Sequence, residues 1–574
     1  MLETIEKQLK DLLKKVGITG EVEFTKPPNL EMGDVAFSCF GIAKKEGKNP
    51  AEVAKEKLED FKFQISNFKL FNKVEAFGPY VNFYLNTAEL AKLTLEEVSR
   101  KDYGSNNLGK GKKVLIEYPS QNTHKEFHIG HFRNVCIGNT IVQLYRANSY
   151  SMIPMNYVND FGRHVVKCLW GIINSSKLGV AHSDIYNAEN KQKMLGNIYV
   201  KSSNYISEHE DEVEHELNEL QAKLEARDPE IMKLFKETRG WSIAGFRELM
   251  DEMKVQHDSI IYESDVKDRG QKIVDELIKK GIAIEGERGA IIIDLNEYNL
   301  DIALLRKSTG AGVYMTSDLG LAERKFTQYN IDESINITGT EQNHYFAQLF
   351  KVLELYGFKH KMIHIGYGLV NLPSGKMAAR SGNVILYEDL RDEIFVNLKK
   401  ETADRHIDWS EKKINDTARI LAMAVLKFTM QKHESNKNIT FDIKEAMSFD
   451  GYSAPYILYA VARINSLLRK AHITYHISHI NCDLIKEIEE KKLLLLLGEY
   501  GEVVKKAQEN YNPSTIARYC FDLAQAFNDF YNKHSILNTE DEEIKKARLA
   551  LSEAVRKVLV DALGLLTIEM VDEM

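Results

Sequence analysis

Two histidines three residues apart, His128 and His131, are the residues of this chain whose spacing most directly indicates a binding or catalytic site. They lie in His128-Ile129-Gly130-His131, which follows a short apolar run typical of a strand. From Ile129 onward apolar residues recur at helical spacing, so the two histidines stand at the start of a predicted helix. Free backbone N–H groups and the dipole at a helix start favour a bound phosphate, to which both imidazoles can donate hydrogen bonds. Gly130 lacks a Cβ, so a nucleobase or ribose can lie against it. With Lys125 as a nearby cation, these residues predict a nucleotide site.

The alternative interpretation of a histidine pair is a structural role or a metal site. The preceding strand, Gly130 and Lys125 favour a nucleotide site instead. The chain contains neither a G-x-G-x-x-G sequence nor a P-loop, so phosphate binding falls to the His128–His131 turn.

The segment before this turn reads as a buried strand that ends in a polar loop. Residues 114–118 are apolar and β-branched except for one carboxylate, Glu117, and Pro119 follows them. The loop gathers polar side chains: Ser120, Gln121, Asn122, His124, Lys125 and His128. In open α/β sheets, ligands bind in the crevice at the carboxyl ends of the strands. We therefore expect the substrates to meet at this loop.

Two carboxylates indicate a substrate that carries a guanidinium group. Glu117 is costly in an apolar strand unless a cation meets it. Asp318 lies one helical turn after Tyr314, so the two can present an anion and a phenol on one face. A planar fork of donors suits carboxylates placed for bidentate pairing. The alternatives are a structural salt bridge from Glu117 to an internal arginine, and a helix cap at Asp318.

The order of elements predicts an α/β fold with a doubly wound, Rossmann-like parallel sheet. Strands are expected at residues 114–118, 151–158, 334–338 and 362–367, each followed by a polar cluster and most by a helix. Long charged helices at about 174–290 interrupt the pattern as an insertion, and the second half resumes at residues 289–294. The acidic run at 205–227 contains two histidines, but a solvated helix face is favoured over a metal site.

Three domains are expected: a small α+β domain at 1–100, a catalytic domain at 101–412 and an all-α bundle at 413–574. The bundle helices are predicted at 414–430, 456–471, 483–507, 514–531 and 541–566. Three tyrosines near Arg463 could stack on unpaired bases, and they are Tyr452, Tyr456 and Tyr459. Aromatic residues at this spacing are equally typical of a helical core, and we expect most of them to be core.

Composition excludes few functions. The 574 residues carry a net charge of −8, which does not exclude RNA binding because phosphate contacts are local. The five cysteines form no C-x-x-C, and the sequence shows neither a signal peptide nor an apolar stretch long enough for a membrane span. We expect a cytoplasmic protein without membrane contact.

The run E-Y-P-S-Q-N-T-H-K-E-F-H-I-G-H-F-R resembles arginyl-tRNA synthetases among the class I aminoacyl-tRNA synthetases. The block at 375–382 stands where that class has the Lys-Met-Ser-Lys-Ser signature, but Lys376 and Met377 are followed by Ala378-Ala379-Arg380. The second lysine is therefore missing. The resemblance implies that Lys125 compensates for it, with Arg380 as a helper.

The resemblance also implies a reaction: L-arginine, ATP and tRNA(Arg) give arginyl-tRNA, with tRNA needed even for activation. Ser120, Asn122 and Gln342 would hold the amino and carboxylate end of arginine beside His131, with Gln121 in the same loop. ATP with Mg²⁺ is the expected co-substrate, without a permanent cofactor, a protein metal site or a second subunit. The first domain would contact the tRNA elbow or serve only as a stabilising appendage, and the last would bind the anticodon. The alternatives are a non-catalytic tRNA-binding paralogue and another nucleotidyl transferase.

Overall fold

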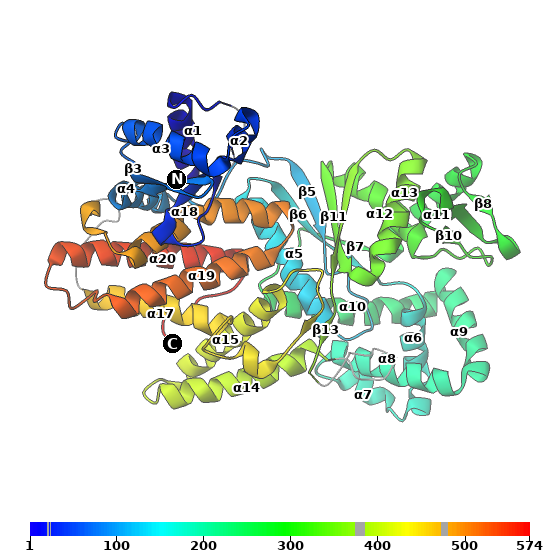
Figure 1. Cartoon of the computed structure of the whole chain (residues 1–574). Helices are drawn as coiled ribbons and strands as arrows, with labels where there is room; N and C mark the ends of the chain where they lie inside the picture. The colour runs from blue at the N-terminus through cyan, green and yellow to red at the C-terminus, as the bar shows by residue number, and fades with distance from the viewer. Residues whose placement is uncertain (20–21, 23, 374–384, 472–479) are drawn as a thin grey trace.

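The computed structural model describes residues 1–19, 22, 24–373, 385–471 and 480–574 (Figure 1). Its centre is a five-stranded parallel sheet in the order β12-β11-β5-β6-β7. The strands are β5 (Lys113–Glu117), β6 (Ser151–Val158), β7 (Ser259–Tyr262), β11 (Glu333–Gly339) and β12 (Lys361–Tyr367). The predicted doubly wound parallel sheet is confirmed.

Strand β5 is buried on both faces, which explains its continuous apolar sequence. Val114 and Ile116 pack toward α5 (Ile129–Ala147) and the helices of the carboxy-terminal part. Leu115 packs on the other face, in a cluster with residues of β6, β7, α11 (Glu263–Lys279) and α12 (Tyr314–Tyr329). The loops after all five strands are thereby held at one edge of the sheet.

A helical insertion separates β6 from β7. It comprises α6 (Arg163–Ile173), α7 (His182–Asn187), α8 (Lys191–Glu208), α9 (Glu210–Glu225) and α10 (Pro229–Glu252). Its end differs from the expected residue 290, because β7 returns the chain to the main sheet at residue 259. The four residues of β7 lie between two long charged helices, which hide so short a strand from a reading of hydrophobic pattern.

Residues 284–306 form a separate sheet rather than resuming the central one. The strands β8 (Ile284–Glu285), β9 (Ile291–Asp294) and β10 (Ile302–Arg306) pair antiparallel in the order β10-β9-β8. The second half, expected to resume at residues 289–294, therefore begins there with a strand of this separate sheet, and the chain returns to the central sheet only at β11. An apolar run of four residues fits a strand of either sheet, so its sequence alone cannot choose between them.

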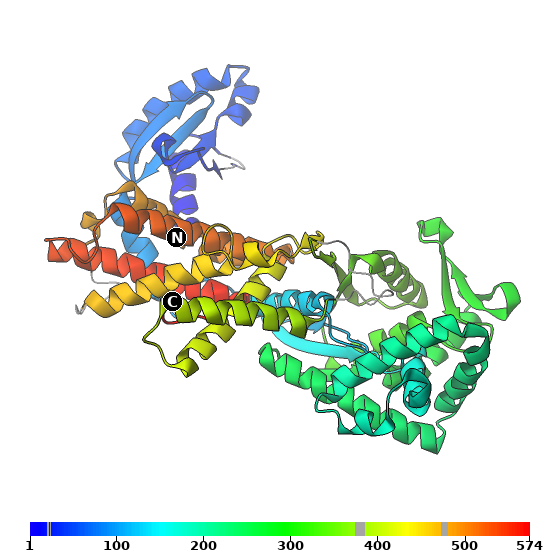
Figure 2. The same ribbon diagram turned by 90° about the horizontal axis from the view of Figure 1, so that it is seen from below.

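The amino-terminal domain is an antiparallel sheet of order β1-β2-β4-β3 with helices packed against it. Its elements are α1 (Leu2–Lys15), β1 (Phe24–Thr25), β2 (Val35–Ser38), α2 (Phe40–Glu46), α3 (Pro50–Ile65), β3 (Phe71–Phe77), β4 (Tyr80–Leu85) and α4 (Thr87–Ser99). Figure 2 shows this domain at one end of the molecule, next to the carboxy-terminal helices. Lys491 on those helices donates to the Asp34 carboxylate at 2.6 Å and also to Leu85 O.

The carboxy-terminal part is a helical bundle, as predicted. Its helices are α14 (Tyr387–Arg405), α15 (Glu411–Gln431), α16 (Ile443–Ala446), α17 (Ala454–Ala471), α18 (Ile488–Glu509), α19 (Pro513–Lys533) and α20 (Glu542–Leu565). A short parallel pair joins the bundle to the catalytic domain: β13 (Val370–Asn371) and β14 (Ile439–Thr440). One hydrophobic cluster runs through the amino-terminal domain, α5 and the bundle. Among the described residues, no helix is long and apolar enough to cross a membrane.

Candidate active site

The His128–His131 turn begins α5, as predicted, but its backbone N–H groups are not all free. His128 is the N-cap, and its Nδ1 accepts from the N–H of Gly130 at 3.1 Å and of His131 at 3.3 Å. The His131 Nδ1 in turn accepts from the His128 N–H at 3.4 Å. The expectation of free N–H groups is therefore corrected: the imidazole occupies two of the donors that a phosphate would use.

Both imidazoles are neutral and present their other nitrogen as a donor. Burial, with the charge of Lys125 as a further cause, lowers the pKa of His128 to about 4. Burial first, then His128 and Lys125, holds the pKa of His131 well below its usual range. The rings stack at 3.7 Å between centroids. Because each Nδ1 accepts a hydrogen bond, the tautomer assigned from this network carries its proton on Nε2.

Lys125 supplies the positive charge near this turn. Its Nζ lies 5.0 Å from the ring centre of Tyr199, which belongs to α8 of the insertion. The Lys125 carbonyl accepts from Gln192 of the same helix at 3.3 Å. The insertion therefore holds the lysine beside the histidine pair.

Glu117 is a buried carboxylate, and its charge is already compensated. It forms an ion pair with Lys325, a buried residue of α12. It also accepts from Asn336 at 2.9 Å and from the Ser120 hydroxyl at 3.3 Å. The alternative considered from the sequence, a structural salt bridge from Glu117 to an internal cation, is therefore present, but the cation is a lysine rather than an arginine.

Asp318 and Glu263 are two further carboxylates at the same edge of the sheet. Burial raises the pKa of Asp318 to about 7, with the Glu117 charge as a further cause against a lowering hydrogen bond from Tyr345. Burial, then the charges of Asp318 and Asp160, raise the pKa of Glu263 to about 8. Neither forms an ion pair within the part of the chain that the structure describes. Such a pair of carboxylates is suited to an incoming cation.

Sequence reasoning missed Glu263, although the signal was present. Glu263 directly follows β7, as the expected site residues follow their own strands. The short β7 was not predicted, so the carboxylate after it was read as part of a charged helix. Tyr157 at the end of β6 was missed as well, and its hydroxyl lies close enough for Asp318, Glu263 and Glu117 to raise its pKa after burial.

Several buried polar atoms around these carboxylates have no hydrogen-bond partner among the described residues. They are both side-chain polar atoms of Gln121, the Tyr157 hydroxyl, Glu263 Oε2 and Asn336 Oδ1. Buried polar groups in folded proteins are almost always paired, because an unpaired one costs about 1–3 kcal/mol. Their concentration at one place indicates a site for a polar ligand.

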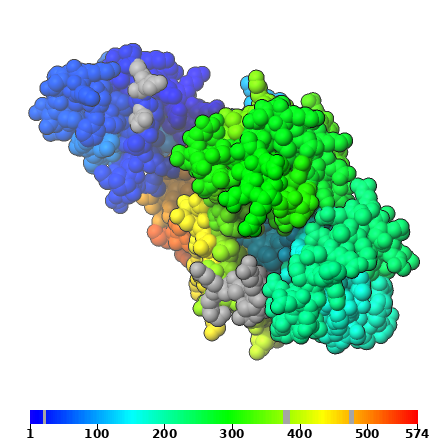
Figure 3. Space-filling model, turned by 90° about the vertical axis from the view of Figure 1, so that its right-hand side faces the viewer, coloured from blue at the N-terminus to red at the C-terminus, as the bar shows by residue number. Residues whose placement is uncertain are grey.

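The other predicted residues line the rim or lie outside the described residues. Asn122 forms an isolated bridge with Asn159, which extends the alignment of β5 and β6 beyond their ends. Tyr314 and Gln342 are exposed, at the start of α12 and after β11 respectively. Lys376, Met377 and Arg380 lie outside the residues that the structure describes. Figure 3 shows the surface hollowed between the green segments beyond β7 and the blue-green insertion.

Comparison with known proteins identifies the family. Residues 94–443 match the class I (R) tRNA synthetase catalytic domain, residues 457–574 the DALR anticodon binding domain, and residues 3–85 the arginyl tRNA synthetase N terminal domain. The arginine–tRNA ligase of Clostridium acetobutylicum is 35% identical over 553 residues, covering 96% of this chain and 95% of that protein. That of Clostridium perfringens is 35% identical over 552 residues, with the same coverage of both proteins.

The chain belongs to the arginyl-tRNA synthetase family. It is thus a class I aminoacyl-tRNA synthetase, and the resemblance noted in the sequence is confirmed. The fold agrees: arginyl-tRNA synthetase of Thermus thermophilus superposes with a TM-score of 0.82 at 24% identity over 100% of both chains. That of Plasmodium falciparum gives 0.77 at 19% identity over 99% of both chains. The alternative of a different nucleotidyl transferase is not favoured.

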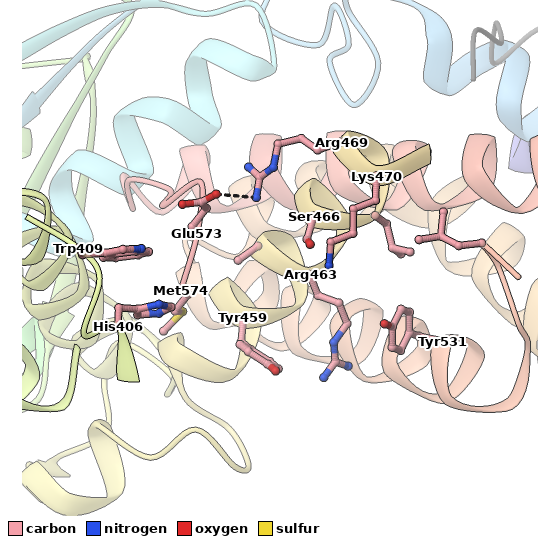
Figure 4. A pocket seen from close by; sticks show the side chains of 13 residues that line it. His406, Trp409, Tyr459, Arg463, Ser466, Arg469, Lys470, Tyr531, Glu573 and Met574 are labelled. Carbon is pink, nitrogen blue, oxygen red and sulfur yellow. Dashed lines mark ion pairs between the residues drawn. The ribbon is translucent and has the colours of Figure 1, made fainter. Parts of the chain in front are cut away.

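The bundle carries a second pocket, of about 430 Å³ (Figure 4). The Arg463 guanidinium lies 4.7 Å from the ring centre of Tyr459 and 4.8 Å from that of Tyr531. His406 and Trp409 stack at 3.9 Å on another side of the pocket. The exposed Lys470 contributes further positive charge, whereas Arg469, also exposed, is paired with Glu573 of the same pocket at 3.0 Å. Cations and aromatic faces therefore meet in one place.

The four predicted tRNA residues divide between this pocket and the core. Tyr459 and Arg463 line the pocket. Tyr452 and Tyr456 instead pack against Phe521 of α19, at ring-centre distances of 5.2 and 5.4 Å. The Tyr452 hydroxyl also donates to Lys432 O at 3.2 Å. The reading of these aromatics as mainly core fits this second pair.

Proposed function

We propose that the chain activates L-arginine with ATP and transfers the arginyl group to the 3′ end of tRNA(Arg). The observation that carries this proposal is the pair Asp318 and Glu263, a half-buried and a buried carboxylate with raised pKa values, neither of which forms an ion pair among the described residues. They lie at the same sheet edge as the capped histidine turn. A site that combines anions for a planar cation with donors for a polyphosphate suits arginine and ATP together.

The two carboxylates would receive the guanidinium group of arginine, with Tyr314 at the rim. Glu117 would then act beside its Lys325 partner, either toward the substrate amino group or by fixing the floor of the site. Ser120, Gln121, Asn122 and Gln342 would hold the amino and carboxylate end, with His131 close to the reacting carboxylate. The unpaired side chain of Gln121 supports this placement, since a bound substrate would give it partners.

ATP would bind along the start of α5, against Gly130. The Nε2–H groups of His128 and His131 would donate to its phosphates as neutral groups, and Lys125 would contribute charge. Lys376, Met377 and Arg380 would complete the clamp from the signature segment. The substrate carboxylate attacks the α-phosphate and pyrophosphate leaves, so the chain need only position and stabilise charge. Mg²⁺ would arrive on the ATP phosphates.

The tRNA would be required for activation as well as for transfer, when its terminal ribose hydroxyl attacks the adenylate. Tyr459 and Arg463 would contact unpaired bases at the pocket of the bundle. Tyr452 and Tyr456 would support that surface from within. The free cysteines fit a reducing cytoplasm, and we propose a monomer there.

Arginine-dependent exchange of pyrophosphate into ATP tests this function, with and without tRNA. We expect exchange with arginine only, and only when tRNA is present. Exchange driven by another amino acid would overturn the assigned specificity. Exchange that proceeds without tRNA would overturn the dependence on tRNA and leave the arginine site intact.

A second experiment separates catalysis from simple tRNA binding, the alternative suggested by Ala378-Ala379. Lys125→Ala and His128→Ala should abolish most arginylation while tRNA affinity stays unchanged. If the unsubstituted protein binds tRNA but never charges it, the binding-only alternative is correct. Glu117→Gln should raise the arginine concentration required, and unchanged arginine kinetics would remove Glu117 from the pocket.

A further inference from the structure

Arg133, on the second turn of α5, is a fully buried cation whose partners are backbone carbonyls. Its guanidinium donates to two separate chain segments. One NH₂ group, Nη1, reaches Gly368 O, Leu369 O and Lys437 O, and the other, Nη2, reaches Glu434 O and Ser435 O. The planar fork of an arginine can serve both segments at once, which a lysine ammonium cannot do with the same geometry.

Burying a charged side chain costs free energy, so this arrangement contributes little to the stability of the fold. Within the described part of the chain no carboxylate forms an ion pair with Arg133. Burial lowers the pKa of Arg133 to about 10, so the side chain still carries its charge at neutral pH. In proteins, replacing a whole buried ion pair by well-packed apolar side chains is often neutral or stabilising, so a buried charge is weak evidence for a role in stability. A role in holding positions accounts for the charge better than a role in stability.

The two segments form a tight contact, which we term the 368–440 seam and which comprises residues 368–371 and 434–440. Gly368 N donates to Ser435 O at 2.9 Å, and Leu369 N donates to the Asn438 side chain at 2.8 Å. A Cβ on Gly368 would lie 2.3 Å from Lys437 O, so the two backbones touch directly. Strands β13 and β14 continue the contact in parallel register.

The seam joins the nucleotide turn to the bundle. Residues 368–369 follow β12 of the central sheet, and residues 434–437 follow α15, which packs on both α5 and α17. Helix α17 carries Tyr459 and Arg463 of the second pocket. Arg133 is two residues after His131 on the same helix. The next residue, Asn134, donates to Ile337 O at 2.9 Å and to Pro119 O at 3.3 Å, which fixes this turn to the substrate loop.

We propose that Arg133 is a positioning residue that couples the seating of tRNA on the bundle to the geometry of His128 and His131. The proposal rests on the proposed function and adds to it the physical connection between the two pockets. A shift of α15 on tRNA binding would move the carbonyls of the seam, and Arg133 would transmit that shift to a rigid helix two residues from the nucleotide site.

The test compares Arg133→Gln and Arg133→Lys with Lys427→Met as a matched control. Lys427 of α15 is also a buried cation with a pKa lowered mainly by burial, and it also donates to carbonyls, those of Met253 at 2.9 Å and Thr567 at 2.7 Å. Its partners lie outside the seam. Lys427→Met therefore leaves buried carbonyls unpaired as well, on the helix that leads into the seam, but removes no hydrogen bond of the seam itself.

Each variant is assayed for arginine-dependent pyrophosphate exchange at saturating tRNA, for the Kd of tRNA and for Tm. We expect Arg133→Gln to lower kcat about 100-fold, the size of effect that a 1 Å misplacement produces, and Arg133→Lys about 10-fold. The KM for arginine and the Kd for tRNA should change by less than about 2-fold. Lys427→Met should lower Tm and leave kcat within about 2-fold of the unsubstituted protein.

Equal kcat values for the Arg133 variants and Lys427→Met would overturn the proposal. So would a fall in kcat that merely follows the fraction of folded protein. If Arg133→Gln does not fold, Arg133→Lys carries the test together with Gly368→Ala, which displaces the seam and leaves Arg133 in place. Absence of exchange in the unsubstituted protein would instead contradict the proposed function.

Discussion

The substrate crevice and the pocket of the bundle are opposite in charge and in their contact with solvent. The crevice gathers the carboxylates Glu117, Asp318 and Glu263, all largely withdrawn from water. The bundle pocket gathers Arg463, which lies against tyrosine rings, with the exposed Lys470 and with Arg469, which is paired with Glu573. A net charge of −8 describes neither place. Binding sites are therefore better read from local sets of side chains than from the sum of charges.

The contrast also predicts different responses to pH and to substitution. Desolvation has moved the pKa values of Asp318 and Glu263 toward neutrality, so the charge of these two carboxylates depends on pH and on the ligand. The bundle pocket instead places the Arg463 guanidinium against two tyrosine rings. The largest effects are expected where a buried charge would lose its partner.

The largest effect is expected from Asp318→Asn, which removes an anion from the acidic crevice. We expect kcat/KM for arginine to fall about 1,000-fold, because a neutral amide leaves part of a desolvated guanidinium unpaired. Arginine-dependent pyrophosphate exchange at saturating tRNA measures the change. Asp294→Asn, at an exposed carboxylate of β9, is the control and should have no effect. A small effect at Asp318 would remove the acidic crevice from arginine recognition.

The second prediction concerns pH. Below about pH 7–8 the Asp318 and Glu263 pair binds protons that an arginine cation must displace. The KM for arginine should therefore fall as pH rises from 6 to 8, by up to about tenfold per unit for each proton displaced. Glu263→Gln should make this dependence shallower and raise the KM at pH 8. A pH profile that is the same in the variant would show that Glu263 does not titrate in this range.

On the other side of the contrast, Arg463→Ala should weaken tRNA binding about 10-fold, the value of losing one base-stacking partner. The KM for arginine should not change. Fluorescence anisotropy with labelled tRNA at two salt concentrations measures both the loss and its salt dependence. Lys546→Ala, which removes a lysine paired with Glu543 on α20, controls for the loss of charge. An equal loss in both variants would point to general electrostatics instead.

The smallest effect is expected at Tyr456→Phe. Tyr456 packs against Phe521 inside the bundle, and phenylalanine keeps that packing. The Kd of tRNA should change by less than about 2-fold, since surface recognition is untouched. A large loss of affinity would show that the hydroxyl contacts RNA, and the division of the tyrosines into pocket and core would fail.

The sequence was informative where local pattern decides structure. Four strands of the central sheet follow from buried apolar runs, and the start of α5 follows from the spacing after Ile129. It was uninformative where partners are distant. Lys325 follows two charged residues and is typical of a surface lysine in the sequence, yet it is buried against Glu117. The four-residue β7 does not show a strand pattern between two charged helices, and Glu263 was lost with it.

The hydrophobic cluster that passes without a break through the amino-terminal domain, α5 and the bundle has a thermodynamic consequence. Elements that share one core lose their packing together, so these parts should melt in a single cooperative event. The insertion has separate clusters around Trp170 and Ile198, and it can open on its own while the rest stays native. Hydrogen exchange should therefore reach the amides of α8 and α9 well before those of α5.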